Sequence, residues 1–212
     1  AGKIYYSAKN TGVNRCERAL WFDESKISTH WAAASIDYVR QKGLMHNNPY
    51  GEFTPNFPLT RGMFVTCLGR LAGVEGDAAS TGYRDLSAGH YAAPYAAWAK
   101  EADIMRGLPD GRFAPDAPIT RQELATALAR YAALCGGVEG GDTSAPVYHD
   151  QAAIADWAKD GVALCGQLGL LVGANGTFSP TDTATRAMGA VILQRLNEAD
   201  LRPQPVENGS NI

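Results

Sequence analysis

Three arginines of this chain each directly follow a threonine, at Arg61, Arg121 and Arg186. A guanidinium group presents a planar fork of N–H donors that can form two parallel hydrogen bonds with one carboxylate. Threonine is a preferred helix N-cap, so each arginine is predicted in the first turn of a helix. There the helix dipole and free backbone N–H groups favour an anion. The three arginines are therefore candidate contacts for a ligand that carries a carboxylate.

The surroundings of each arginine recur with it. Gly-x-Phe-x-Pro precedes every Thr-Arg pair, and the arginine follows the phenylalanine by eight residues each time. An aromatic residue followed by alanine lies further upstream, at Trp31, Tyr91 and Trp157. Before it, an aspartate closely follows an aromatic residue, at Asp23, Asp85 and Asp150. Because chance does not produce five ordered features three times, the chain contains three tandem copies of one unit.

The recurring residues have both functional and structural interpretations. The aromatic side chains offer flat apolar faces to a sugar ring, but each opens an apolar helical stripe, so core packing is the alternative. The arginines offer a contact to a ligand anion, and the alternative is an ion pair with the aspartate of the same copy. The three aspartates are candidate ligand contacts as well. The sequence leaves both choices open.

Each copy predicts a helix, a loop and a second helix, so we expect a mainly α fold. The first helix is predicted from about the aromatic residue, and in the middle copy Tyr91, Tyr95 and Trp98 would share one face. The loop contains Asp110-Gly111 or Asn175-Gly176, pairs that favour positive φ in a tight turn. The proline two residues after each phenylalanine is predicted to keep that stretch extended.

The second helix is predicted to begin at the threonine of each copy. Thr120 and Glu123 match a full capping box, whereas Met63 and Met188 replace the glutamate elsewhere and predict weaker caps. An apolar stripe with i, i+3, i+4, i+7 spacing follows in every copy: Phe64, Cys67, Leu68, Leu71; Leu124, Ala127, Leu128, Tyr131; Gly189, Ile192, Leu193, Leu196. Each stripe predicts one buried helix face.

The four cysteines do not predict a metal or redox site. Cys67 lies in an apolar stripe and Cys165 aligns with Val39 and Ala99, so both are expected to act as small core residues. Cys16 and Cys135 lie outside the stripes. We expect free thiols there, and a bridge between these two stays open for an exported protein.

Composition and missing motifs exclude several classes of function. The net charge of −3 offers no basic excess for nucleic-acid phosphates. No apolar run approaches the roughly 20 residues of a membrane span, and the N-terminus lacks a signal peptide, which implies either a removed leader or a fragment. Dispersed Cys and His residues predict no metal, and the Asp110-Gly111 loop lacks the carboxylates of a calcium loop. Without a nucleophile elbow, P-loop or zinc-protease motif, we expect neither a cofactor nor an enzyme.

The ordered motifs resemble the surface-layer homology (SLH) module. The aromatic-x-Asp, Trp-Ala, Gly-Phe-Pro and Thr-Arg elements all match, most clearly at Ile119-Thr120-Arg121-Gln122-Glu123. Copies one and three lack the acidic residue of that last motif, and Tyr91 stands in place of tryptophan. The resemblance divides the chain into an N-terminal extension (1–20), repeats at 21–75, 83–136 and 147–197, and a C-terminal tail (198–212).

The resemblance implies a fold and a function. Three SLH repeats form a pseudo-threefold trimer within one chain and hold surface proteins non-covalently on the bacterial cell wall. Their ligand is a secondary cell-wall polysaccharide, often with pyruvate ketals, or another peptidoglycan-linked glycan, bound in grooves between repeats by the arginine of Thr-Arg. The resemblance thus implies a location at the cell surface and possible contacts with other surface-layer subunits. The competing hypotheses are a self-assembly or protein-docking module without glycan binding, and a wall-active hydrolase.

Overall fold

The computed structural model describes residues 24–76, 80–136, 144–201 and 203, and its regular elements there are all helical. The elements in chain order are η1 (Glu24–Thr29), α1 (Ala33–Gln41), α2 (Arg61–Leu71), α3 (Ala93–Glu101), α4 (Arg121–Leu134), η2 (Gln151–Ala153), η3 (Asp156–Ala158), α5 (Lys159–Gln167) and α6 (Arg186–Glu198). The predicted mainly α fold of three helical copies is confirmed. Asp23, Cys16 and the N-terminal extension lie outside the described residues, as does most of the C-terminal tail.

The second helix of every copy (α2, α4 and α6) begins at the arginine and is capped by the threonine before it, as predicted. Thr60 and Thr185 each accept from the backbone N–H three residues on, at 3.2 and 3.3 Å. In α4 the carboxylate of Glu123 also accepts from the backbone N–H of Thr120 at 2.8 Å, which completes the capping box. The outer copies lack this second bond because a methionine side chain has no oxygen to accept it.

The apolar stripes of these second helices are buried, as predicted. Cys67 in α2 is 5 % exposed and Cys165 in α5 is fully buried, so both occupy the core positions expected of them. Burial raises the pKa of the Cys67 thiol to about 11 and that of Cys165 to about 12. Both thiols therefore stay protonated at neutral pH and behave as small apolar groups.

The buried face of α3 differs from the prediction at Tyr91, whereas Tyr95 and Trp98 pack against the core as expected. The fully buried residues of α3 are its alanines, Ala93, Ala96 and Ala99. Tyr91 is instead exposed, and Tyr95 is half-buried. α3 approaches α2 closely, and Tyr95 lies in that contact, since a Cβ added to Gly69 would lie 2.3 Å from Cδ1 of Tyr95. Small side chains permit that approach, whereas the sequence pattern gave the larger aromatic residues more weight.

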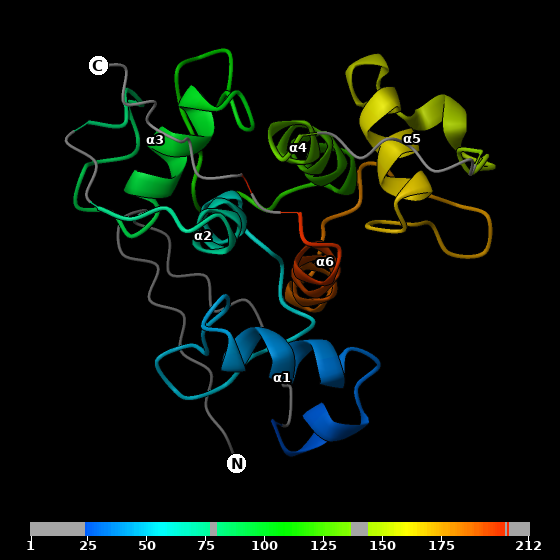
Figure 1. Cartoon of the computed structure of the whole chain (residues 1–212), viewed down its shortest axis with the longest axis horizontal. Helices are drawn as coiled ribbons and strands as arrows, with labels where there is room; N and C mark the ends of the chain where they lie inside the picture. Colours follow the sequence, from blue (N-terminus) through cyan, green and yellow to red (C-terminus); the bar gives the residue numbers. More distant parts are fainter. Residues whose placement is uncertain (1–23, 77–79, 137–143, 202, 204–212) are drawn as a thin grey trace, which may run out of the picture.

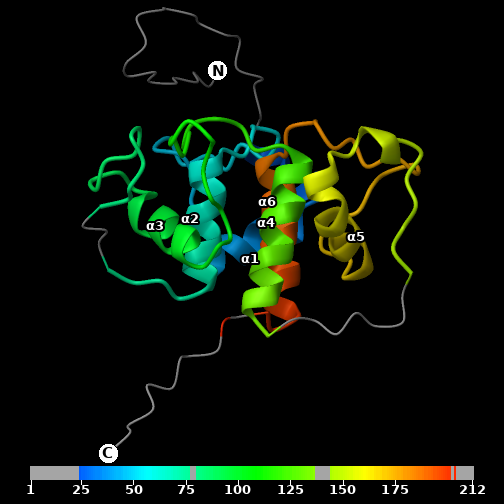
Figure 2. The ribbon, with the colours of Figure 1, turned by 90° about the horizontal axis from the view of Figure 1, so that it is seen from above.

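Each first helix packs against the second helix of the copy before it. α3 lies on α2, α5 lies on α4, and α1 of the first copy lies on α6 of the last copy. In Figure 1 the second helices α2, α4 and α6 surround the centre, and α1, α3 and α5 lie outside them. Seen from the side, the three second helices stand upright next to one another (Figure 2). The packing unit is therefore shared between neighbouring copies, although the sequence repeat is contained within one.

Backbone hydrogen bonds join the three copies at the centre in a closed cycle. The N–H of Leu59 donates to the carbonyl of Ala184 at 2.8 Å, Ala184 donates to Ile119 at 2.9 Å, and Ile119 donates to Leu59 at 2.9 Å. Isolated β-bridges between the same segments accompany these bonds. The cycle runs from each copy to another and returns to its start, which is consistent with the expected pseudo-threefold arrangement within one chain.

Candidate functional site

The three motif arginines are buried, and each reaches into the Gly-x-Phe-x-Pro loop of the next copy. Each is 7 % exposed. The Nε atoms of Arg61, Arg121 and Arg186 donate to the backbone carbonyls of Phe113, Phe178 and Phe53, at 2.9, 2.7 and 2.8 Å. Each guanidinium also lies over the ring of that phenylalanine, 4.6 to 5.3 Å from its centroid. The arginines therefore fasten neighbouring copies together, and the contacts of copy three close on copy one.

The helix N-termini that hold these arginines are already hydrogen bonded. The backbone N–H groups of Arg61, Arg121 and Arg186 each donate to a loop carbonyl of the next copy at 2.9 Å. The N–H groups that follow donate to the carbonyls of Pro115, Pro180 and Pro55. The threonine side chain takes the third N–H of each helix. The expectation of free N–H groups for an anion is therefore wrong, because the neighbouring copy occupies them.

The recurring aspartates hold the phenylalanine loop from the other side. Asp85 accepts from the N–H groups of Phe113 and Ala114, both at 2.8 Å, and Asp150 does the same in copy three. Those contacts hold the peptides on both sides of the phenylalanine. Ala114, the residue before the proline, has a positive φ of +57°. The predicted extended conformation there is therefore wrong. Contact between these aspartates and a ligand stays a prediction, and Asp23 lies outside the described residues.

No ion pair between a motif arginine and Asp85 or Asp150 occurs among the described residues. In copies two and three, contacts with the neighbouring copy therefore replace the predicted pairing with the aspartate of the same copy, whereas the pairing of Arg61 with Asp23 stays a prediction. Arg61 forms an ion pair with Glu123, with 3.2 Å between Nη1 and Oε1.

The recurring aromatic residues are exposed. Trp31 is 66 % exposed, Tyr91 is 52 % exposed and Trp157 is 58 % exposed. Each lies at or just before the start of its first helix, where the hydroxyl of Tyr91 contacts Thr60 and the segment η3, which contains Trp157, packs against α4. The core-packing alternative for these residues is therefore wrong, and their faces are accessible to a ligand.

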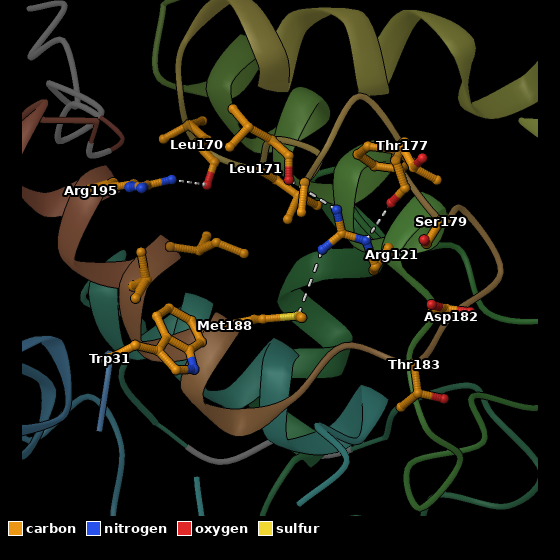
Figure 3. A pocket seen from close by; sticks show the side chains of 15 residues that line it. Trp31, Arg121, Leu170, Leu171, Thr177, Ser179, Asp182, Thr183, Met188 and Arg195 are labelled. Carbon is orange, nitrogen blue, oxygen red and sulfur yellow. Dashed lines mark hydrogen bonds between the residues drawn. The ribbon is translucent and has the colours of Figure 1, made fainter. Parts of the chain in front are cut away.

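A cavity of about 400 Å³ lies along α6, and we call it the α6 groove. Its floor contains Met188 and Ile192 of copy three, Arg121 of copy two lies at one side, and Trp31 of copy one lies at the rim. Figure 3 shows Arg121 and Arg195 on opposite sides of the groove, with Met188 between them and Trp31 at its edge. All three copies therefore contribute to one groove.

An equivalent cavity of about 510 Å³ lies along α2, and we call it the α2 groove. Met63 and Cys67 occupy the floor positions, Arg186 takes the place of Arg121, and Tyr91 takes the place of Trp31. The two grooves therefore repeat the same combination of a buried guanidinium, an apolar floor and an exposed aromatic ring.

The Nη1 atom of the motif arginine has a different partner beside α4 than beside α2 and α6. Nη1 of Arg121 contacts the sulfur of Met188 at 3.7 Å, and Nη1 of Arg186 contacts the sulfur of Met63 at the same distance. On α4, Glu123 stands at this position and bonds Nη1 of Arg61. A thioether is a weak acceptor, whereas a carboxylate is a strong one.

A second set of arginines recurs and escaped the sequence reasoning. Arg70, Arg130 and Arg195 lie nine residues after the motif arginines, and each donates to a carbonyl just beyond the first helix of its own copy. Arg70 lines the α2 groove and Arg195 lines the α6 groove. Their constant spacing was a usable signal, but an arginine in the last turn of a helix is also typical of a solvated surface.

Arginine supplies the positive charge of the grooves, and Asp182 adds one carboxylate to the lining of the α6 groove. Burial lowers the pKa of Arg121, although a guanidinium stays protonated at neutral pH. In the α2 groove, burial raises the pKa of Tyr91, and burial followed by the charge of Arg70 lowers that of His46. Tyr91 and His46 are therefore neutral at pH 7. Each groove thus places positive charge beside an apolar floor.

Among the described residues there is no cluster of three or more His, Cys, Asp and Glu side chains arranged to hold a metal ion. A separate search of the same residues finds no helix with the length and apolar character required to cross a bilayer.

A closed helical repeat domain with ligand-sized grooves between its copies is the class that this fold defines. The chain matches the S-layer homology domain at residues 23–62, 82–125 and 147–187, together more than half of its length. It therefore belongs to the S-layer homology family, as the ordered motifs predict.

Similar proteins include an S-layer protein, an anchoring protein and an enzyme. The chain is 28 % identical over 170 residues to "S-layer protein sap" of Bacillus anthracis, which covers 80 % of this chain and 20 % of that protein. It is 34 % identical over 110 residues to a "Cellulosome-anchoring protein" of Acetivibrio thermocellus, covering 50 % of this chain and 24 % of that protein. An "Amylopullulanase" of Thermoanaerobacterium thermosulfurigenes is 29 % identical over 174 residues, covering 81 % of this chain and 9 % of the enzyme.

The chain therefore spans only a small part of the curated relatives that it matches. Most of the amylopullulanase lies outside the match, so the similarity is no basis for assigning the activity in its name to this chain. Family membership and the surface proteins among the relatives indicate a module for anchoring at the cell surface and cell wall.

Proposed function

We propose that this chain anchors a surface protein non-covalently to the bacterial cell wall by binding a carboxylate-bearing secondary cell-wall polysaccharide, such as a pyruvylated one. The observation that carries the proposal is the α6 groove, where a buried guanidinium, an apolar floor and an exposed indole come from three different copies. A cell-wall glycan with acidic groups has matching chemistry, because its sugar rings have apolar faces and its carboxylates accept charge-assisted hydrogen bonds.

The dimensions of the grooves support a site for a few sugar units. Their volumes of about 400 and 510 Å³ lie within the usual range of small-molecule sites, roughly 300–1,000 Å³. Nη1 of Arg121 faces the groove and has only a thioether as its acceptor there, so a ligand carboxylate would replace a weak hydrogen bond with a strong one. Nε and Nη2 are held by backbone carbonyls and keep the guanidinium in place.

Retention on purified cell-wall sacculi tests the proposal. We expect the protein to sediment with sacculi that carry their polysaccharide and to stay in the supernatant when the polysaccharide has been stripped. Loss of retention on intact wall would refute the proposal, and retention on stripped wall would identify peptidoglycan as the ligand. Concentration-dependent light scattering without wall affinity would favour the self-assembly alternative.

Trp31→Ala combined with Tyr91→Ala tests the grooves themselves. Both side chains are more than half exposed, so we expect the folded state to persist while retention falls by about tenfold or more, as loss of stacking predicts. Tyr50→Ala is the matched control, because Tyr50 is 54 % exposed and is not part of the lining of either groove. Equal retention of the double variant and the control would exclude the aromatic rims from the binding site.

A further inference from the structure

The three motif arginines share one backbone contact and differ in the partner of Nη1. Nε donates to a phenylalanine carbonyl in every copy. Nη1 contacts methionine sulfur in the α2 and α6 grooves, at Met63 and Met188. On α4 the same nitrogen is bonded to the carboxylate of Glu123 at 3.2 Å. The nitrogen that would receive a ligand anion therefore already has an anion in the middle copy.

Glu123 is held in this position by two further bonds. Its second oxygen accepts from the backbone N–H of Thr120 at 2.8 Å and from the hydroxyl of Thr120 at 2.7 Å. These bonds belong to the capping box of α4, so moving the carboxylate away from Arg61 would also remove the helix cap. The side chain of Glu123 is 30 % exposed and that of Arg61 is 8 % exposed, so a ligand carboxylate that approached Arg61 would meet Glu123 first.

From these contacts we infer that Glu123 excludes an anionic ligand from the surface of α4 around Arg61 and Arg130, which we call the α4 face. The chain would then have two anion-binding grooves rather than three. The inference rests on the proposed function and specifies which copies perform it. Two carboxylates beside one guanidinium repel each other, and we expect the α4 face to bind a carboxylate about 100-fold more weakly than the other grooves. At Nη1 in the two grooves, a ligand carboxylate displaces a weak thioether contact.

The rest of the α4 face is similar to the other two. Arg130 recurs at the position of Arg70 and Arg195, and η3, which contains Trp157, packs against α4. Glu123→Met would therefore give α4 the residue that α2 and α6 carry at the same position. Since those helices form with methionine and with only the threonine cap, the variant is expected to fold.

NMR of methyl-labelled methionine reports ligand binding to each groove separately, because each groove contains its own methionine. The probe is a synthetic methyl hexosaminide that carries a pyruvate ketal. In the wild-type protein we expect the methyl signals of Met63 and Met188 to shift on titration and two equivalents to bind. In Glu123→Met the new methyl should shift as well, and binding should rise to three equivalents. Glu123→Gln keeps an oxygen for the Thr120 cap and should also gain the third equivalent.

The controls separate the inference from the proposed function. Glu101→Gln removes an exposed carboxylate of α3 and should leave two equivalents bound. Trp157→Ala should not change binding by the wild-type protein. Binding of three equivalents by the wild-type protein would overturn the inference but not the proposed function. The same holds if Met63 and Met188 respond in Glu123→Met while the methyl signal of residue 123 does not shift. If neither Met63 nor Met188 responds, the proposed function itself is refuted, and the inference with it.

Discussion

Replacing Arg121 with alanine should lower stability as well as glycan binding, because the guanidinium holds two copies together. Its Nε and Nη2 atoms donate to the carbonyls of Phe178 and Val172, at 2.7 and 3.0 Å. Hydrogen bonds to charged groups contribute about 1.5–3 kcal/mol each, and we take the lower end because water from the groove can reach the carbonyls. Loss of contact with the Phe178 ring adds about 1 kcal/mol. The expected total is about 4 kcal/mol.

Thermal unfolding followed by circular dichroism measures this loss. For a chain of this size, about 4 kcal/mol corresponds to a fall in Tm of roughly 8–16 °C. The far-ultraviolet spectrum at 20 °C should be unchanged, because the helices themselves remain capped. Arg106→Ala is the matched control, since Arg106 is exposed and its ion pair with Asp103 lies on the surface, and its Tm should equal that of the wild type. A fall of less than about 2 °C for Arg121→Ala would refute the structural role of the guanidinium.

Three further predictions concern the loops and caps. Ala114→Gly should stabilise the protein by about 0.5–1 kcal/mol, since φ is +57° there, and a lower Tm would contradict the strain argument. The N–H of Phe178 lowers the pKa of Asp150, so the stability from this carboxylate is present above its ordinary pKa and is lost as pH falls through the lowered value. In urea unfolding between pH 5 and 2, the free energy of unfolding should therefore fall less steeply for Asp150→Asn than for the wild type. Identical pH dependence in the two proteins would exclude this linkage. Thr120→Ala should cost about 1–2 kcal/mol and Thr60→Ala about half as much, because Thr120 belongs to a capping box, and the reverse order in denaturant midpoints would argue against it.

The sequence predicted local structure better than contacts between copies. The caps at Thr60, Thr120 and Thr185 and the buried stripes followed from short-range spacing, which fixes helix starts and faces. The exposure of Tyr91 and the burial of the alanines of α3 did not follow, because the close contact between helices favours small side chains.

The candidate site was only partly accessible to the same reasoning. The motif arginines and exposed aromatic residues do line the two grooves, as their recurrence suggested. The carbonyl partners of Arg121 lie more than fifty residues away in the chain, and no local pattern indicates which copy supplies them. The contrast between Glu123 and Met188 was visible, but only its effect on capping could be predicted before the position of Nη1 was known.

The closed cycle of contacts also fixes how many copies this architecture can contain. In an open solenoid each added repeat finds a free end to stack on, so arrays of different length can fold. Here α1 already covers α6, and Arg186 already reaches the loop at Phe53, so neither end is left for a fourth copy. Every junction joins unlike surfaces, as in a cyclic assembly of separate subunits. Gain or loss of a copy would therefore require the whole ring to rebuild.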